Sequence, residues 1–270
     1  MNKFFRAKSI TLSNGKVVEE KKSDALLISL LLLVFLIIAL RVTGYDSSLL
    51  AKNSRNLTVI LKDIFNPDWD YLPKVIGPTI DTIKMSLFGS FLGALLALPA
   101  AFLAASNMVN NKFINWLFKL LFTILRTLPT LVIALIATYV FGLGTLAGTF
   151  AIFIFSFAYV GKLMYEEIET QDLGAYEAMI SLGYTKAMAF FKGIIPSIMP
   201  TYLSTALFNF EGNVRYASIL GYVGAGGLGL LINENIGWRD YNRVGTILFA
   251  LVITVFIIEL ISRTIRKKLS

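Results

Sequence analysis

The side chains in this chain that could do chemistry are charged groups inside otherwise apolar runs. Glu211 and Arg215 are four residues apart in the run Pro200–Tyr222, a spacing that allows an ion pair on one helix face. Each charge would cost about 2.5–3.5 kcal/mol at the centre of a membrane helix, so this face must meet a cavity, a pathway or another polar helix. The pair predicts an internal bridge, a translocation pathway, or both. Glu259 and Arg263 share the spacing and predict an interfacial pair without function.

Helical spacing extends the polar side of this run. One narrow arc holds Ser204, Glu211, Arg215, Ser218 and Tyr222, and a second polar arc beside it holds Thr205, Asn209, Asn213 and Tyr216. Apolar residues fall on the opposite side, which can face lipid or a neighbouring helix. The predicted translocation residues are Ser204, Glu211, Asn213, Arg215 and Ser218.

The sequence offers little else for catalysis. It has no cysteine and no histidine among 270 residues, which removes thiol chemistry and the commonest metal ligand. We predict no catalytic, cofactor-binding or metal-binding residue, and no enzyme activity in this chain. No G-x-x-x-x-G-K-[ST] motif occurs, so the chain carries no P-loop of its own.

The run Gly224–Gly229 matches the dinucleotide fingerprint G-x-G-x-x-G, but its context does not. No predicted strand precedes it, and it follows an apolar span. Glycine also permits tight turns and close helix approach, so we predict an external turn or gate. Its residues are Gly224, Gly226, Gly227 and Gly229.

The composition predicts a polytopic membrane protein. Apolar residues make up 56% of the chain, charged residues only 16%, and the mean hydropathy is +0.70. We expect an all-α bundle of about six transmembrane helices. The apolar runs lie at about 25–40, 82–105, 128–141, 146–160, 200–222 and 244–261.

The first run, 25–40, is slightly too long for a signal peptide, and no A-x-A cleavage site follows it, so we interpret it as a retained span. Residues 1–80 would form a cytoplasmic tail, this extra span and an external loop at 44–78 that can hold a short amphipathic helix. Residues 81–270 would form the core. With an inside N-terminus, fifteen lysines and arginines fall in inner segments and six in outer loops, as the positive-inside rule requires, so both termini are expected in the cytoplasm.

The charged segment between the fourth and fifth spans, at about 162–197, predicts two short helices with a joint. Gly183 is placed to end the first helix in a left-handed turn. Thr185 can cap the second helix, and Pro196 is expected to stop it. Glu177 near a helix start is favoured by the helix dipole.

Three motifs resemble those of binding-protein-dependent ABC importer permeases of the phosphonate type, and the resemblance covers about Phe118 to Lys268. They are RTLP at 126–129, the loop from Glu177 and Ala178 through Gly183 to Pro196, and FEGNVRYASILGYVGAGGLG at 210–229. Two positions depart from the loop pattern: Met179 replaces an alanine, and Gly193 replaces an aliphatic residue. Methionine permeases share the loop and the glycine run but are less similar through Glu211, Asn213 and Arg215.

The resemblance implies a type I importer permease in the bacterial plasma membrane. It implies a homodimer, two cytoplasmic ATPases that bind ATP and magnesium, and an external substrate-binding protein. The 177–196 loop would couple ATP-driven motion to alternating access, and the cargo would be phosphonate, phosphite or phosphate. The alternatives are a methionine-type or other small-solute permease and, from another class, an ion-coupled secondary transporter that titrates Glu211.

Overall fold

The computed structural model describes residues 9–11, 15, 17–19 and 25–269, and it divides into two compact units between Val59 and Ile60. In the first unit, strands β1 (Ser9–Thr11) and β2 (Val17–Glu19) pair antiparallel, with Ser9 opposite Glu19. The sequence pattern does not predict this hairpin. Helix α1 (Ala25–Val42) follows and is apolar on every side, with no residue buried. It matches the predicted first span.

The predicted loop at 44–78 is largely helical. Helix α2 (Ser47–Ile64) has a clear separation of polar and apolar sides, and the division between the two units falls within it. A short 3₁₀ turn, η1 (Trp69–Tyr71), then leads directly into α3 (Leu72–Ala104). The predicted domain boundary at 80/81 therefore lies inside a continuous helix, because Pro78 within α3 does not end it.

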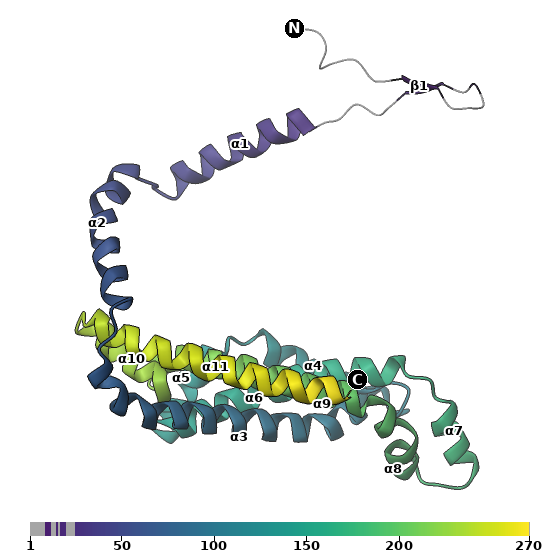
Figure 1. Cartoon of the computed structure of the whole chain (residues 1–270). Coiled ribbons are helices and arrows are strands. Elements are labelled where there is room, and N and C mark those ends of the chain that lie inside the picture. The colour runs from purple at the N-terminus through teal and green to yellow at the C-terminus, as the bar shows by residue number, and fades with distance from the viewer. Residues whose placement is uncertain (1–8, 12–14, 16, 20–24, 270) are drawn as a thin grey trace. The chain divides into compact units, whose positions relative to one another are not determined.

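The second unit is a bundle of helices (Figure 1). Its remaining elements are α4 (Lys112–Thr127), α5 (Thr130–Phe141), α6 (Thr145–Thr170), α7 (Gly174–Ser181), α8 (Lys186–Ala189), the π-helical turn η2 (Phe190–Ile194), α9 (Ile195–Leu220), the 3₁₀ turn η3 (Gly221–Val223), α10 (Gly227–Gly237) and α11 (Tyr241–Leu269). Helices α7 and α8 lie beyond one end of the bundle, which is also where α11 ends, and α10 lies at the other end.

Small residues bring the two central helices together. The most extensive helix contact is between α3 and α6. A Cβ added at Gly93 of α3 would lie 2.6 Å from the Cβ of Ser156 on α6, and one at Gly89 would lie 2.8 Å from the Thr149 carbonyl oxygen. Close approach of this kind is how membrane helices associate when burial of apolar surface gives little driving force between them.

Within the described residues, four helices are long and apolar enough to cross a membrane, and up to six spans result if each of two bent pairs counts as one. The bent pairs are α4 with α5, at 91°, and the segment 186–223 with α10, at 49°. Helix α5 alone covers about 18 Å at 1.5 Å per residue, short of the roughly 30 Å hydrocarbon core. The expected count of about six therefore depends on broken helices.

Two local expectations need correction. Pro196 does not stop a helix: it lies in the first turn of α9, and the chain is helical without a gap from α8 through η2. The π-helical turn η2 directly precedes this proline, and a local irregularity of that kind accommodates a missing backbone N–H within a continuous helix. Helix α9 also begins before Pro200, which lies inside it. The glycine run is a turn followed by a helix, α10, which the sequence analysis did not predict.

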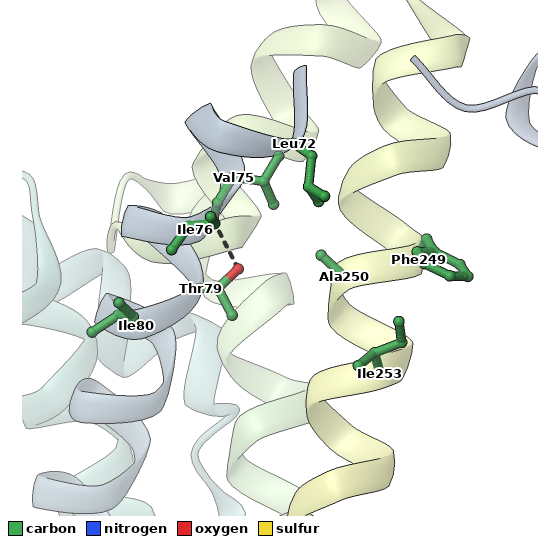
Figure 2. Close-up of a pocket in the computed structure, with 8 residues that line it drawn as sticks. All are labelled: Leu72, Val75, Ile76, Thr79, Ile80, Phe249, Ala250 and Ile253. Carbon is green, nitrogen blue, oxygen red and sulfur yellow. Dashed lines mark hydrogen bonds between the residues drawn. The ribbon is translucent and has the colours of Figure 1, made fainter. Parts of the chain in front are cut away.

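The bundle carries an apolar groove between α3 and α11 (Figure 2). Its volume is about 240 Å³. The hydroxyl of Thr79, which lines it, donates to the Val75 carbonyl, drawn as a dashed line. All other residues that line this groove are apolar, so it offers no free donor to a polar ligand.

Candidate coupling loop and transport site

The joint between α7 and α8 is a glycine-terminated helix end. Gly183 has φ +87°, its N–H donates to the Ile180 carbonyl, and the N–H of Tyr184 donates to the Met179 carbonyl. This pair of bonds is the Schellman motif, and it confirms the predicted left-handed turn. The Thr185 hydroxyl accepts from the Met188 N–H at 3.3 Å, so the predicted cap of α8 is confirmed as well.

The inner side of the loop is fixed to the bundle. Tyr176 of α7 is buried, and a Cβ at Gly193 of η2 would lie 2.9 Å from both its N and Cα atoms. This close approach explains why a glycine stands at 193, since any side chain would push α7 away. Tyr176 joins Phe190, Ile194 and other residues in an apolar cluster with α3, α4 and α6. Burial raises the pKa of the Tyr176 phenol, which keeps it neutral.

The outer side of the loop is exposed and partly apolar. Glu177 and Ala178 are exposed on α7, and Leu182 beside the joint is 73% exposed. Tyr184 and Met188 are exposed too, and an open cavity of about 300 Å³ is lined by residues 182–184. Exposed apolar side chains on a firmly seated loop form a surface suited to a protein partner.

The ion pair between Glu211 and Arg215 forms as the spacing predicts. The Glu211 side chain is only 6% exposed, whereas that of Arg215 is 53% exposed. A third group completes the cluster: Nη2 of Arg266, near the end of α11, lies 3.4 Å from the second carboxylate oxygen of Glu211. One carboxylate thus faces two guanidinium groups, which leaves the cluster with a net positive charge.

The predicted polar arcs of α9 divide between the interior and the exposed surface. Asn213 is buried, and its amide donates to Ser90 of α3 at 2.8 Å and to Ser156 of α6 at 2.9 Å. The amide of Asn209 also donates to Ser156. Because these bonds join three helices, the observed contacts of Asn213 are those of a residue that positions α9 rather than one that faces an open path.

The exposed face of α9 carries Arg215 together with Tyr216 and Ile219, and Tyr222 in the following turn η3 is exposed too. Val214 and Ala217 are fully buried, so the predicted apolar side packs on neighbouring helices at this level. Ser218 is partly buried, and its hydroxyl donates to the Arg215 carbonyl. Ser204 is partly buried and lines a cavity near the start of α9.

The glycine run fixes the other end of α9. Gly224, Gly226 and Gly227 all have positive φ, between +67° and +80°. A Cβ at Gly229 would lie 2.1 Å from the Ser218 carbonyl oxygen, so only glycine allows α10 to cross the end of α9 at this distance. The Leu228 N–H donates to the hydroxyl of a threonine on α3 at 2.8 Å, which connects the turn to the bundle core.

Arg266 is the site residue that sequence reasoning missed. Arg266 lies in the basic tail, whose charges the sequence analysis used only to predict the orientation of the chain in the membrane. It is 55 residues from Glu211 in the sequence. The expected pair Glu259–Arg263 does not form within the described residues, where both side chains are exposed. No local signal in the sequence indicates this contact, because helical spacing relates residues on one helix and Glu211 lies on another.

The fold is that of a polytopic membrane helix bundle, with an exposed and partly apolar loop at one end and a cluster of charged side chains on α9 and α11. The chain belongs to the family of binding-protein-dependent transport system inner membrane components, whose model matches residues 97–270. This family works with ATPase and substrate-binding protein partners.

Individual relatives agree with this membership. The phosphate-import permease protein PhnE of Mycolicibacterium smegmatis is 33% identical over 188 residues, which are 70% of this chain and 35% of that protein. The chain thus spans about a third of the length of this relative. The phosphite transport system permease protein PtxC of Stutzerimonas stutzeri is 28% identical over 222 residues, which are 82% of this chain and 81% of that protein.

A solved structure shows the same fold. The inward-facing MetNI methionine ABC transporter matches 75% of this chain and 99% of its own with a TM-score of 0.65, at 20% identity. At that identity the match supports the fold alone. The predicted type I importer permease fold is therefore confirmed.

Proposed function

We propose that this chain is the transmembrane permease subunit of an ATP-driven importer for a phosphorus oxyanion, such as phosphonate, phosphite or phosphate. The observation that carries the proposal is the α7–α8 loop, which is fixed to the bundle on one side and exposes apolar groups beside Glu177 on the other. The relatives named for phosphate and phosphite transport favour this cargo over methionine.

The loop would act as the coupling element. Two partner ATPases would bind ATP and magnesium, and their closure would move α7 and α8. Because Tyr176 packs directly on the backbone of η2, and η2 continues into α9, a displacement of the loop would reach α9 through rigid contacts. Alternating access requires a mechanical link of this kind and no covalent chemistry in the permease.

The transport path would follow the exposed face of α9. Arg215 is half exposed there, and an exposed charge in a membrane helix needs water or a partner surface. We therefore propose a homodimer in which the two copies of this face line the path. The two guanidinium groups around Glu211 give this region the positive charge that an anionic cargo requires.

The subunit would lie in the bacterial plasma membrane with both termini in the cytoplasm. The bias of lysine and arginine supports this orientation. The location of α7, α8 and the end of α11 at one end of the bundle is consistent with it, because the ATPases are cytoplasmic (Figure 1).

Reconstituted transport tests the proposal. The full chain, its ATPase and its binding protein would be placed in liposomes, and uptake of radiolabelled methylphosphonate, phosphite, phosphate and methionine would be compared. We expect ATP-dependent uptake of a phosphorus oxyanion that methionine does not inhibit. Uptake by this chain alone, driven by an ion gradient, would contradict the proposal and support the secondary transporter.

A further inference from the structure

A cavity with four polar lining residues lies between the start of α9 and the end of α11. Its volume is about 260 Å³, and it is lined by Pro200, Thr201, Ser204, Thr205, Arg266 and Leu269. A water molecule occupies about 30 Å³ in the liquid, so a small tetrahedral anion fits with several waters. None of these lining residues is acidic, and four of them carry hydrogen-bond donors.

The three hydroxyls in this cavity are free. Elsewhere on α9, the hydroxyls of Ser197 and Ser218 donate to backbone carbonyls three residues before them. The hydroxyls of Thr201, Ser204 and Thr205 make no hydrogen bond to any described residue. Helical serine and threonine commonly satisfy themselves on the preceding turn, so three unbonded hydroxyls along one turn leave donors for something else.

Arg266 supplies the charge. Its one contact to a described acidic residue is the 3.4 Å approach of Nη2 to Glu211, and its guanidinium also lies 5.7 Å from the Phe208 ring centroid. Glu211 already pairs with Arg215. A guanidinium has five N–H donors in a planar fork that matches an oxyanion, so most of its donors remain for a ligand.

Two buried polar atoms lie one helical turn from residues that line this cavity. Ser262 Oγ is one turn before Arg266 on α11, and Asn209 Oδ1 is one turn after Thr205 on α9. Both atoms are buried and have no hydrogen-bond partner among the described residues. Buried polar groups are rarely left unpaired, so water or a ligand is expected to reach them.

We infer that this cavity is a binding subsite for a tetrahedral phosphorus oxyanion, with Arg266 as the charged donor and Thr201, Ser204 and Thr205 as neutral donors. The inference rests on the proposed function and deepens it. The subsite lies at the end of the bundle that carries α7 and α8, so it would hold the cargo just before release (Figure 1). Arg266 would exchange its long contact with Glu211 for the anion.

A direct binding experiment tests this subsite. The full chain with its ATPase would be placed in phosphatidylcholine nanodiscs, and methylphosphonate binding would be measured by calorimetry and ³¹P NMR. We expect Arg266→Gln to weaken binding at least tenfold, because one charge-assisted hydrogen bond is worth about that factor. The double variant Ser204→Ala with Thr205→Val, which retains the charge cluster, should weaken it severalfold.

The matched control is Arg263→Gln, on the same helix but exposed and without an ion pair among the described residues. It should bind methylphosphonate like the parent. Equal binding by the parent and all variants would overturn the subsite. The hydroxyl variant keeps the test valid if Arg266→Gln does not fold.

A lipid headgroup has the same phosphate chemistry and is the other source of such an anion. Nanodiscs with added phosphatidylglycerol would show whether that lipid is retained on the complex through Arg266. Retention of the lipid without methylphosphonate binding would overturn the cargo subsite. Uptake by the parent distinguishes failure of the subsite from failure of the proposed function. If the complex imports methylphosphonate but binds it independently of Arg266, the subsite alone is refuted. If the complex imports no phosphorus oxyanion, the proposed function is refuted.

Discussion

The charge cluster on α9 predicts that its two paired residues are unequal in their effect on stability. Arg215→Gln would leave the Glu211 carboxylate, only 6% exposed, with Arg266 at 3.4 Å as its remaining partner. Glu211→Gln would remove the partner of both Arg215 and Arg266, but those side chains are 53% and 25% exposed and can be hydrated along a wet path. We therefore expect the arginine substitution to be the more destabilising.

The size of the difference follows from burial. Breaking a buried ion pair by removing one partner costs about 3–5 kcal/mol, and a charge-assisted hydrogen bond contributes about 1.5–3 kcal/mol. Because Arg266 still contacts the carboxylate, we expect the lower range, about 1.5–3 kcal/mol, for Arg215→Gln. Glu211→Gln removes the buried charge itself and leaves only partly exposed guanidinium groups, so we expect a smaller loss, about 1 kcal/mol.

Thermal unfolding of the purified full chain shows which of the two substitutions destabilises the protein more. One kcal/mol shifts the melting temperature by about 2–4 °C in proteins of 150–250 residues, so Arg215→Gln should lower it by several degrees. The double variant should be more stable than Arg215→Gln, because it leaves no buried carboxylate to be neutralised. The control Arg263→Gln should match the parent.

The reasoning would be refuted if Glu211→Gln destabilised the protein as much as Arg215→Gln does. That result would mean that Arg215 is not hydrated and that both charges are equally buried in the assembled protein. Uptake then separates the roles of the pair. A structural bridge lets the double variant regain uptake with its stability, whereas a pathway role leaves uptake low, which is the result we expect.

Three further predictions concern the loop and the assembly. Gly183→Val should reduce uptake while the protein still reaches the membrane, because valine disfavours φ +87° and would misdirect α8. Gly193→Ala should uncouple ATP hydrolysis from uptake, since its methyl group would meet the α7 backbone at 2.9 Å. Cysteine at Tyr216, on the exposed face of α9, should cross-link two copies, while cysteine at buried Val214 should not. The chain has no native cysteine to interfere.

Gly237 provides the control for both glycine variants, because an added Cβ there meets nothing within 4 Å and its φ is not positive. Normal uptake by the Gly183 and Gly193 variants would remove the coupling role from the loop. Cross-links from position 214 without any from position 216 would show that the opposite face of α9 lines the transport path.

Sequence reasoning was most reliable where a feature depends on neighbouring residues. The left-handed turn at Gly183, the cap at Thr185 and the Glu211–Arg215 pair were all predictable, because backbone conformation and helical spacing are local properties. The apolar runs predicted the membrane class and an all-α bundle for the same reason, whereas the type I permease fold was predicted from the resemblance to a family. The presence of Pro196 in a first turn was missed, because a proline can begin a helix as readily as it ends one.

Only the tertiary structure decided which distant residues meet. It brought Arg266 to Glu211 across 55 positions, and it directed Asn213 toward Ser90 and Ser156 rather than into an open path. It also explained Gly193 by the close approach of α7. Such contacts depend on how closely small residues let helices approach and on which faces then meet, and helical periodicity gives the faces of one helix without naming its neighbours.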